Sequence, residues 1–226
     1  MTKVLIGTPS YDGKLDIWYV NSLLHTIPLG MEHGIEFYPF WVFNDALVMR
    51  ARNDLFKIMM EGNFDYMLCV DGDMAWEPQW AVDLVKYKRD VVGGTTRMKT
   101  DDQEMYVTGF YDDDLKFDDD GLMSVRSLGF GFVCFSRKVV QQLWEDATPY
   151  RNPGGNDSRL VCNVGIVNGE LYGEDSMVYV KLREWGYKLW VDPKMCCSHI
   201  GPKKFDGDFE DYLKRLQASN SSMWGS

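Results

Sequence analysis

The chain has 226 residues, with 24 lysines and arginines against 34 aspartates and glutamates, so its formal net charge is −10. This length predicts one domain with a single core. A hydrophobic fraction of 45% argues against a disordered chain, and no apolar run is long enough to span a bilayer. The acidity counts against a broad nucleic-acid-binding face, although it leaves room for a local basic patch.

Two features indicate the compartment. The N-terminus turns polar at Thr8, too early for the apolar region of a secretory signal. The five cysteines are odd in number and lack framework spacing, so we expect reduced thiols in a cytoplasmic protein, or in the host cytoplasm if the protein is viral. Cys196 and Cys197 precede His199, but no second ligand pair accompanies them, so zinc is not predicted.

Short apolar runs alternate with helical patterns in the first half. Strands are expected at 4–7, 35–43, 64–70 and from 91, and helices at 15–26, between 44 and 62, and from 78. Asn44 is expected to cap the second helix, and Pro78 to begin the third. This alternation predicts right-handed βαβ units and a mostly parallel sheet, with a nucleotide-binding half over residues 1–100.

The second half, residues 101–218, has a mixed pattern. Residues 105–133 predict antiparallel hairpin strands with a turn at Asp120-Gly121. Helices are expected at 136–144, 174–185 and around 209–216, and a strand at 187–191. The segment 148–158, rich in Pro, Gly and Asn, predicts a mobile loop that acts as a lid. The single domain therefore covers 1–218, followed by a flexible tail at 219–226.

Asp-x-Asp occurs four times, but only Asp71-Gly72-Asp73 follows an apolar strand, where open α/β sheets bind ligands. The two carboxylates share a direction, and Gly72 allows a ligand to come close. Such a pair suits Mg²⁺ or Mn²⁺ that also holds a diphosphate. A solvated turn that binds no metal would explain the two aspartates equally well. The triplets at 112–114 and 118–120 are expected to be solvated acid on the hairpin.

Further polar residues are expected near this edge of the sheet. His199 follows the last predicted strand, where a neutral imidazole can complete a metal shell, and a surface histidine is the alternative. Lys203 and Lys204 come next and suit phosphate oxygens. Glu174 and Asp175 begin a helix, where capping alone would also explain them. No P-loop and no nucleophile-elbow motif occurs.

The chain resembles GT-A-type glycosyltransferases over nearly its full length, in particular the small enzymes of bacteria, phages and large viruses. Each matching segment is short, and their order and spacing carry the resemblance. It implies an α/β fold with a Rossmann-like nucleotide-binding half, a mostly parallel central sheet and a mixed, acceptor-binding half with an antiparallel hairpin. The matching segments are Gly7-Thr8-Pro9, Arg50-Ala51-Arg52-Asn53, Asp71-Gly72-Asp73, Gly129-Phe130-Gly131-Phe132, Gly173-Glu174-Asp175, Trp190-Val191-Asp192-Pro193 and His199-Ile200-Gly201.

On the donor side, the resemblance implies a metal-dependent glycosyltransferase that uses a nucleotide-diphosphate sugar, with a UDP-sugar favoured, and Mn²⁺ or Mg²⁺. The residues implied around the nucleotide are Thr8, Pro9 and Tyr11 at the base and ribose, and Arg52 and Asn53 as support. Those implied at the metal and the diphosphate are Asp71, Gly72, Asp73, His199, Lys203 and Lys204.

On the acceptor side, the resemblance implies that Glu174 and Asp175 face the acceptor, one of them holding its hydroxyl or acting as base. An Asp placed like Asp175 is the base of inverting members. The segment 199–204 is similar to that of retaining enzymes that use UDP-sugars, and it slightly favours retention. The acceptor stays open between a glycan, a protein and a modified base of viral DNA, and so does the oligomeric state.

Two other functions stay open. A non-catalytic sugar- or nucleotide-binding protein would release no nucleotide from any donor. A sugar-nucleotide nucleotidyltransferase would need a loop rich in glycine and lysine after the first strand, and residues 8–14 contain little of this pattern.

Overall fold

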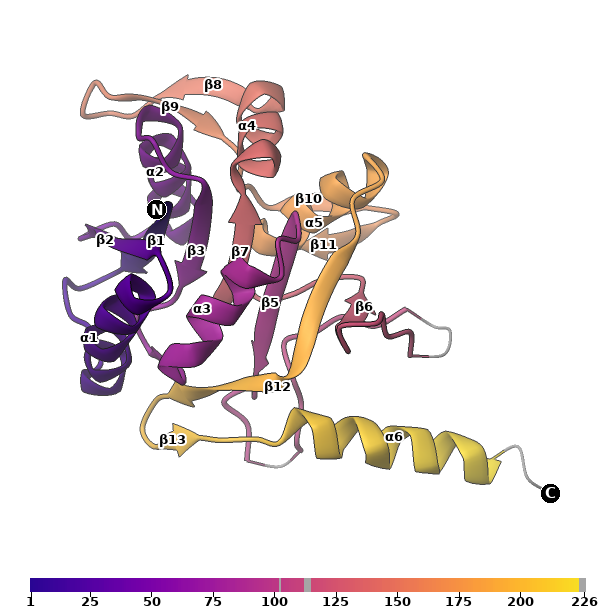
Figure 1. The fold of residues 1–226 in the computed structure, drawn as a ribbon. Coiled ribbons are helices and arrows are strands. Elements are labelled where there is room, and N and C mark those ends of the chain that lie inside the picture. Colours follow the sequence, from indigo (N-terminus) through magenta and orange to yellow (C-terminus); the bar gives the residue numbers. More distant parts are fainter. Residues whose placement is uncertain (102, 112–114, 224–226) are drawn as a thin grey trace.

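Helices and strands alternate along the first half of the chain and mix in the second (Figure 1). The computed structural model describes residues 1–101, 103–111 and 115–223, and the side chains only up to residue 218 in the last range. The helices are α1 (Ile17–Glu32), α2 (Val48–Glu61), α3 (Pro78–Lys86), α4 (Arg137–Asp146), α5 (Glu174–Glu184) and α6 (Phe209–Met223). The strands are β1 (Thr2–Ser10), β2 (Ile35–Phe43), β3 (Tyr66–Val70), β4 (Met74–Ala75), β5 (Val91–Thr96), β6 (Met123–Val125), β7 (Phe132–Ser136), β8 (Thr148–Arg151), β9 (Asp157–Leu160), β10 (Gly165–Val167), β11 (Glu170–Tyr172), β12 (Leu189–Ile200) and β13 (Lys204–Phe205).

The central sheet has the order β13-β12-β5-β7-β3-β1-β2. Strands β2, β1, β3, β5 and β12 share one direction, and β7 runs against them between β3 and β5. Two small antiparallel hairpins, β8–β9 and β10–β11, lie outside this sheet. The predicted fold class, an α/β fold with a mostly parallel central sheet, is confirmed.

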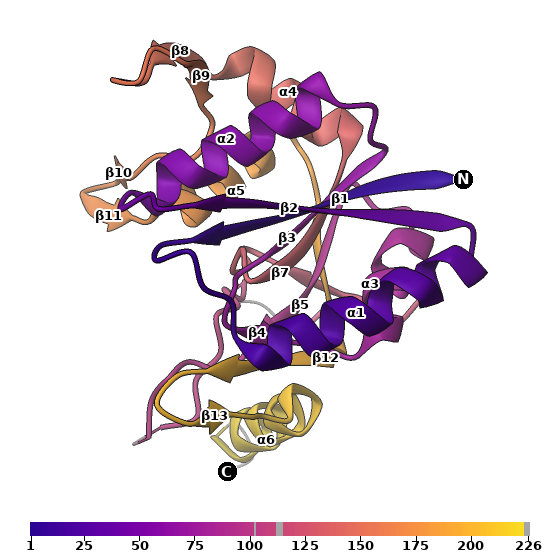
Figure 2. The ribbon, with the colours of Figure 1, turned by 90° about the vertical axis from the view of Figure 1, so that its left-hand side faces the viewer.

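Helices cover both faces of the sheet (Figure 2). Helices α1 and α3 lie on one face, and α2, α4 and α5 on the other. Successive strand residues point to opposite faces, so Val4 and Ile6 enter the core under α1 and α3 while Leu5 enters the other core. Burial on both faces explains why these strands read as continuous apolar runs in the sequence.

Local side chains set the helix starts. Asp16 caps α1 by accepting a hydrogen bond from Trp18 N at 2.8 Å, and Pro78 opens α3 as predicted. The prediction that Asn44 caps α2 is wrong. Asn44 has a φ of 60°, a left-handed conformation that asparagine tolerates, and it turns the chain after β2. The helix begins only at Val48.

The predicted hairpin over 105–133 is largely irregular backbone. It contains β6, which pairs with β12, and isolated bridges such as Gly109 with Ser127. The predicted turn is present, because Gly121 has a φ of 77° and donates to the carbonyl of Asp118. Asp118 and Asp120 are not simply solvated, since both pair with Arg89 at 2.7 and 2.6 Å. The triplet 112–114 lies outside the described residues.

The segment 148–158, predicted to be a loop, forms most of the β8–β9 hairpin. Lys57 Nζ on α2 donates to the carbonyl of Asp157 at 2.8 Å, and Arg159 donates to carbonyls at the end of α4, including that of Ala147 at 3.1 Å. The hairpin therefore packs on α2 and α4. At the other end of the chain, α6 continues past residue 219, where the flexible tail was expected, and residues 224–226 lie outside the described part.

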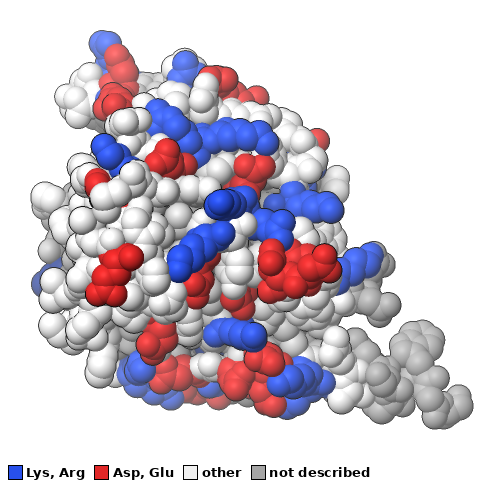
Figure 3. All heavy atoms as spheres, in the orientation of Figure 1, with Lys and Arg blue, Asp and Glu red and all other residues white. Residues whose placement is uncertain are grey.

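The surface mixes both signs of charge. On the face shown in Figure 3, basic and acidic side chains lie side by side, so this face is not a continuous basic surface of the kind that holds a nucleic-acid backbone. Within the described ranges, no helix is both long and apolar enough to cross a bilayer. All five cysteines are free thiols, and only Cys196 among them is partly exposed.

Candidate functional site

The carboxyl ends of β1 and β3 meet at one edge of the sheet, and a cavity of about 600 Å³ opens there. We call it the first cavity. Its walls come from the segment after β1, the first turns of α2 and the turn after β3. The residues predicted from the sequence that line it are Pro9, Tyr11, Arg52, Asp71, Gly72, Asp73 and His199.

A second cavity, of about 420 Å³, lies beside the first. Its walls come from residues 106–109, 127–131 and the first turn of α5, which contributes Asp175. Arg52, Asp71 and His199 line both cavities. These three residues therefore form a shared wall, and a ligand that fills one cavity can reach the other past them.

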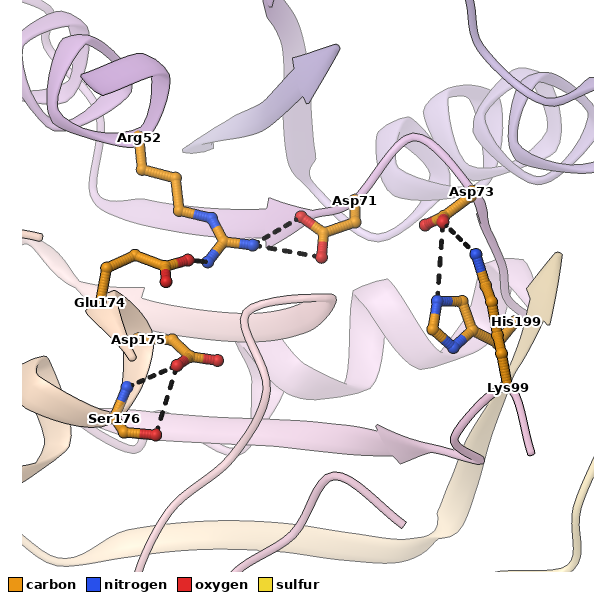
Figure 4. A network of polar contacts seen from close by, with 8 residues as sticks. All are labelled: Arg52, Asp71, Asp73, Lys99, Glu174, Asp175, Ser176 and His199. Atoms are coloured by element: carbon orange, nitrogen blue, oxygen red, sulfur yellow. Dashed lines mark hydrogen bonds and ion pairs between the residues drawn. The ribbon is translucent and has the colours of Figure 1, made fainter. Parts of the chain in front are cut away.

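Arg52 is the centre of a buried ion-pair network (Figure 4). Its Nη2 donates to both carboxylate oxygens of Asp71, at 2.9 and 3.2 Å, and its Nη1 donates to Glu174. The guanidinium also lies over the ring of Phe130, 5.1 Å from its centre. Burial disfavours the charge on Arg52, but the carboxylates of Asp71 and Glu174 outweigh burial and raise the pKa of Arg52. The network thus links α2, the end of β3 and the start of α5.

Asp73 is the centre of a second set of polar contacts. Its Oδ2 lies 2.6 Å from Lys99 Nζ and 3.5 Å from His199 Nε2. Burial raises the pKa of Asp73, but its contacts with His199 and Lys99 outweigh burial and lower the pKa to about 2. His199 Nδ1 lies 3.1 Å from the carbonyl oxygen of Arg97. Because a carbonyl only accepts, Nδ1 carries a proton, and Nε2 is the ring nitrogen that faces Asp73.

The predicted metal ligands Asp71, Asp73 and His199 all line the first cavity, but they do not form one cluster. Asp73 and His199 face each other, whereas Asp71 is turned to Arg52 (Figure 4). Across the described ranges of the chain, no three His, Cys, Asp or Glu side chains gather in a way that could hold a metal ion. A carboxylate oxygen and an imidazole nitrogen are suitable ligands for a divalent cation, so Asp73 and His199 fit part of a metal shell.

The two acidic residues that begin α5 have different surroundings. Asp175 lines the second cavity, and its Oδ1 accepts hydrogen bonds from Ser176 N at 2.6 Å and from Ser176 Oγ at 3.3 Å. Glu174, which was also expected to face the acceptor, pairs with Arg52 and lines neither cavity. Both carboxylates lie in the first turn of the helix, where the macrodipole favours negative charge.

Thr8 and Asn53, which were predicted at the nucleotide, line neither cavity. Thr8 is fully buried, and its hydroxyl is 2.7 Å from that of Tyr19. Asn53 is also buried, where its Nδ2 donates to the Cys162 carbonyl at 3.2 Å and its Oδ1 accepts from Cys162 N at 2.7 Å. Asn53 therefore fastens the segment before β10 to α2.

The two lysines predicted at the diphosphate also line neither cavity. Lys203 pairs with Asp101, and Lys204 Nζ lies 3.3 Å from Asp206 Oδ1. Lys14 lines the first cavity, and Lys99, which sequence analysis missed, lines neither cavity but contacts Asp73. The available signal for Lys99 was its position, because it follows shortly after β5, whose carboxyl end lies at the same edge of the sheet as that of β3.

No protein-family model matches the sequence, and no curated protein matches it. Solved structures match the fold. The crystal structure of A197 from STIV gives a TM-score of 0.56 at 14% identity, over 91% of this chain and 94% of that chain. GalNAc-T7, crystallised with UDP, GalNAc and Mn²⁺, gives a TM-score of 0.50 at 11% identity, over 90% of this chain and 44% of that chain.

The similarity to A197 extends over nearly the whole of both chains, whereas this chain spans less than half the length of GalNAc-T7. At sequence identities of 14% and 11%, the comparison shows a similarity of fold alone. The mostly parallel central sheet with its small antiparallel hairpins agrees with these neighbours. The chain therefore has the fold of the GT-A glycosyltransferases.

Proposed function

We propose that the protein is a metal-dependent glycosyltransferase, which moves a sugar from a nucleotide-diphosphate sugar to the hydroxyl of an acceptor. The observation that carries the proposal is the shared wall of the two cavities, which lies at the carboxyl ends of the parallel strands. A donor with its nucleotide in the first cavity and its sugar in the second would place the bond to be broken at this wall.

The first cavity suits a nucleotide in size and lining. Its volume of about 600 Å³ is typical of small-molecule sites. Pro9 and Tyr11 line it, and the Tyr11 ring is largely exposed and available to stack on a base. A UDP-sugar is the favoured donor, in keeping with the UDP and GalNAc bound by GalNAc-T7. Thr8 and Asn53 would then support the site from behind its walls.

Asp73 and His199 would hold Mn²⁺ or Mg²⁺, and Asp71 would join them if its carboxylate left Arg52. The metal would stabilise the negative charge that grows on the departing diphosphate. Lys203 and Lys204 would contribute to this charge balance only after leaving Asp101 and Asp206. Gly72 lines the first cavity between the two aspartates and leaves room for the diphosphate.

Asp175 is the proposed base. Within the described residues, both hydrogen bonds to its carboxylate come from Ser176 and reach Oδ1, so Oδ2 can accept the proton of an acceptor hydroxyl. Glu174 acts indirectly, by holding Arg52 in the shared wall. A base at Asp175 supports inversion, whereas the sequence of residues 199–204 supports retention. NMR of the first anomer formed distinguishes the two.

The test is nucleotide release from a panel of nucleotide sugars in the presence of Mn²⁺, with water as the acceptor. One donor should be hydrolysed slowly, and release should stop when EDTA is added or when Asp73 is replaced by Asn. Asp157→Asn is the matched control, because this exposed aspartate belongs to the β8–β9 hairpin and lines neither cavity. No release from any donor would contradict the proposal and favour a sugar- or nucleotide-binding protein.

A further inference from the structure

Lys99 has no part in the function proposed above, yet its ammonium is directed at Asp73 (Figure 4). The contact is specific in geometry, since Nζ lies 2.6 Å from Oδ2. This is the same carboxylate oxygen that lies 3.5 Å from His199 Nε2. A lysine and a prospective metal ligand therefore approach one oxygen atom of Asp73.

Backbone hydrogen bonds hold the segments on either side of this contact. The amide of Ile200 donates to the carbonyl of Asp73 at 2.8 Å, which ties the end of β12 to the turn after β3. The amide of Met98 donates to the carbonyl of Met105 at 2.8 Å, which fixes the loop that carries Lys99. His199 Nδ1 lies 3.1 Å from the carbonyl oxygen of Arg97 and so joins this loop to the end of β12. Three segments that are distant in sequence therefore hold Lys99 in place.

Gly201 leaves room for the lysine side chain. A Cβ atom at this position would lie 3.2 Å from Lys99 Cδ, so the aliphatic part of the side chain runs against the glycine. The Lys99 side chain is still 33% exposed. Its ammonium can leave Asp73 by rotation of the side chain alone, while the backbone keeps its hydrogen bonds.

An ammonium and a divalent cation cannot both contact one carboxylate oxygen without strong like-charge repulsion. A metal that binds Asp73 through Oδ2, the oxygen that faces His199, must therefore displace Lys99. The displaced ammonium then needs another anionic partner, and a diphosphate held by the same metal offers phosphate oxygens, which form strong charge-assisted hydrogen bonds with lysine.

We propose that Lys99 couples the binding of the divalent metal to the binding of the nucleotide diphosphate. This inference rests on the proposed function, because it concerns the same metal site. Without nucleotide, Lys99 competes with the metal for Asp73 and weakens its binding. With nucleotide, Lys99 moves to the diphosphate and both ligands bind more tightly. Lys99 is thus a binding residue for the leaving group that also controls when the metal is held.

The test measures the dissociation constant of Mn²⁺ by electron paramagnetic resonance, with and without UDP, in the wild type and in Lys99→Gln. The ratio of the two constants is the coupling factor. Lys99→Gln should bind Mn²⁺ about tenfold more tightly without UDP, and its coupling factor should fall by about tenfold, within the usual range for coupled sites. Its affinity for UDP in the presence of Mn²⁺ should fall as well.

Lys181→Gln is the matched control. Lys181 Nζ lies 2.8 Å from Asp146, and its side chain is 29% exposed, close to the value for Lys99. This variant should keep the wild-type coupling factor. Lys99→Arg retains the charge and a partner for Asp73, so it should keep weak Mn²⁺ binding without UDP. If Lys99→Arg has the weak Mn²⁺ binding of the wild type, the effect of Lys99→Gln comes from the lost positive charge.

Two results would overturn the inference in different ways. If the wild type binds Mn²⁺ and Lys99→Gln has the same coupling factor, Lys99 does not link the ligands, while the proposed metal site stands. If the wild type binds no Mn²⁺ with or without UDP, the proposed metal site itself is refuted and the role of Lys99 falls with it.

Discussion

Replacement of Arg52 by Met tests the ion-pair network most directly. Methionine keeps much of the aliphatic volume of the arginine stem but removes the charge between two carboxylates. The Arg52, Asp71 and Glu174 side chains are 9%, 28% and 17% exposed, so none of the three is well solvated. The substitution leaves two acidic groups, both sheltered from water, close together and without a cation.

The expected loss is large. Removing one partner of a buried ion pair costs about 3–5 kcal/mol of the free energy of unfolding, because the remaining charge stays desolvated. A second substitution, Glu174→Gln, removes one of the two stranded charges. The double variant should therefore recover about 0.5–3 kcal/mol, the usual coupling energy for residues in one network.

Urea denaturation followed by tryptophan fluorescence measures these free energies. Arg151→Met is the control, since Arg151 pairs with Asp157 on the surface and its side chain is 71% exposed, so its loss should leave the unfolding midpoint unchanged. The reasoning is refuted if Arg52→Met is no less stable than this control, or if Glu174→Gln adds a further loss to Arg52→Met instead of restoring stability.

Three further predictions concern the base, the support of the site and the thiols. Asp175→Asn should reduce turnover about 10²–10⁴-fold, the usual range for a general base, while the calorimetric affinity for UDP is unchanged; a proportional loss of both would assign Asp175 to donor binding. Asn53→Ala leaves the buried amide of Cys162 without its partner and should cost about 1–3 kcal/mol in urea denaturation, whereas a neutral result would mean that water replaces the amide. Burial raises the pKa of the Cys134 thiol from 9.0 to about 12. Above pH 9 the unfolded thiol ionises first, so stability should fall as the pH rises from 9 towards 12, and Cys134→Ala should make this fall shallower; an equal slope in both proteins would contradict the shift.

The sequence predicted best those helices and strands that are determined by their own residues. The strand β2 has the bounds expected from its aromatic and β-branched residues, and Pro78 begins α3 because its ring fits the first helical turn. Asn44 shows the limit of such signals. The same residue type favours helix caps and left-handed turns, and only the tertiary path from β2 to α2 decides between them.

The site is harder to predict from sequence, because its contacts join residues that are far apart in the chain. Arg52 meets Glu174 across 122 positions, and neither residue has a neighbour that signals the other. Sequence analysis therefore assigned Glu174 to the acceptor and Lys203 to the diphosphate, and it overlooked Lys99. The carboxyl ends of the strands were the usable signal. That rule correctly predicted that Asp71, Asp73 and His199 lie close together, and all three line the first cavity.

The place of β7 in the sheet has a consequence for how the protein is made. Both neighbours of β5 in the main sheet, β7 and β12, come from the second half of the chain, so residues 1–100 cannot form a complete sheet alone. About a hundred residues separate the end of β5 from the end of β12, which is roughly 5–20 s of synthesis at ordinary rates. During this time one edge of β5 lacks β12, and its other edge is also bare until β7 has been made at Ser136. Fragments divided near residue 100 should therefore recover structure only when they are refolded together.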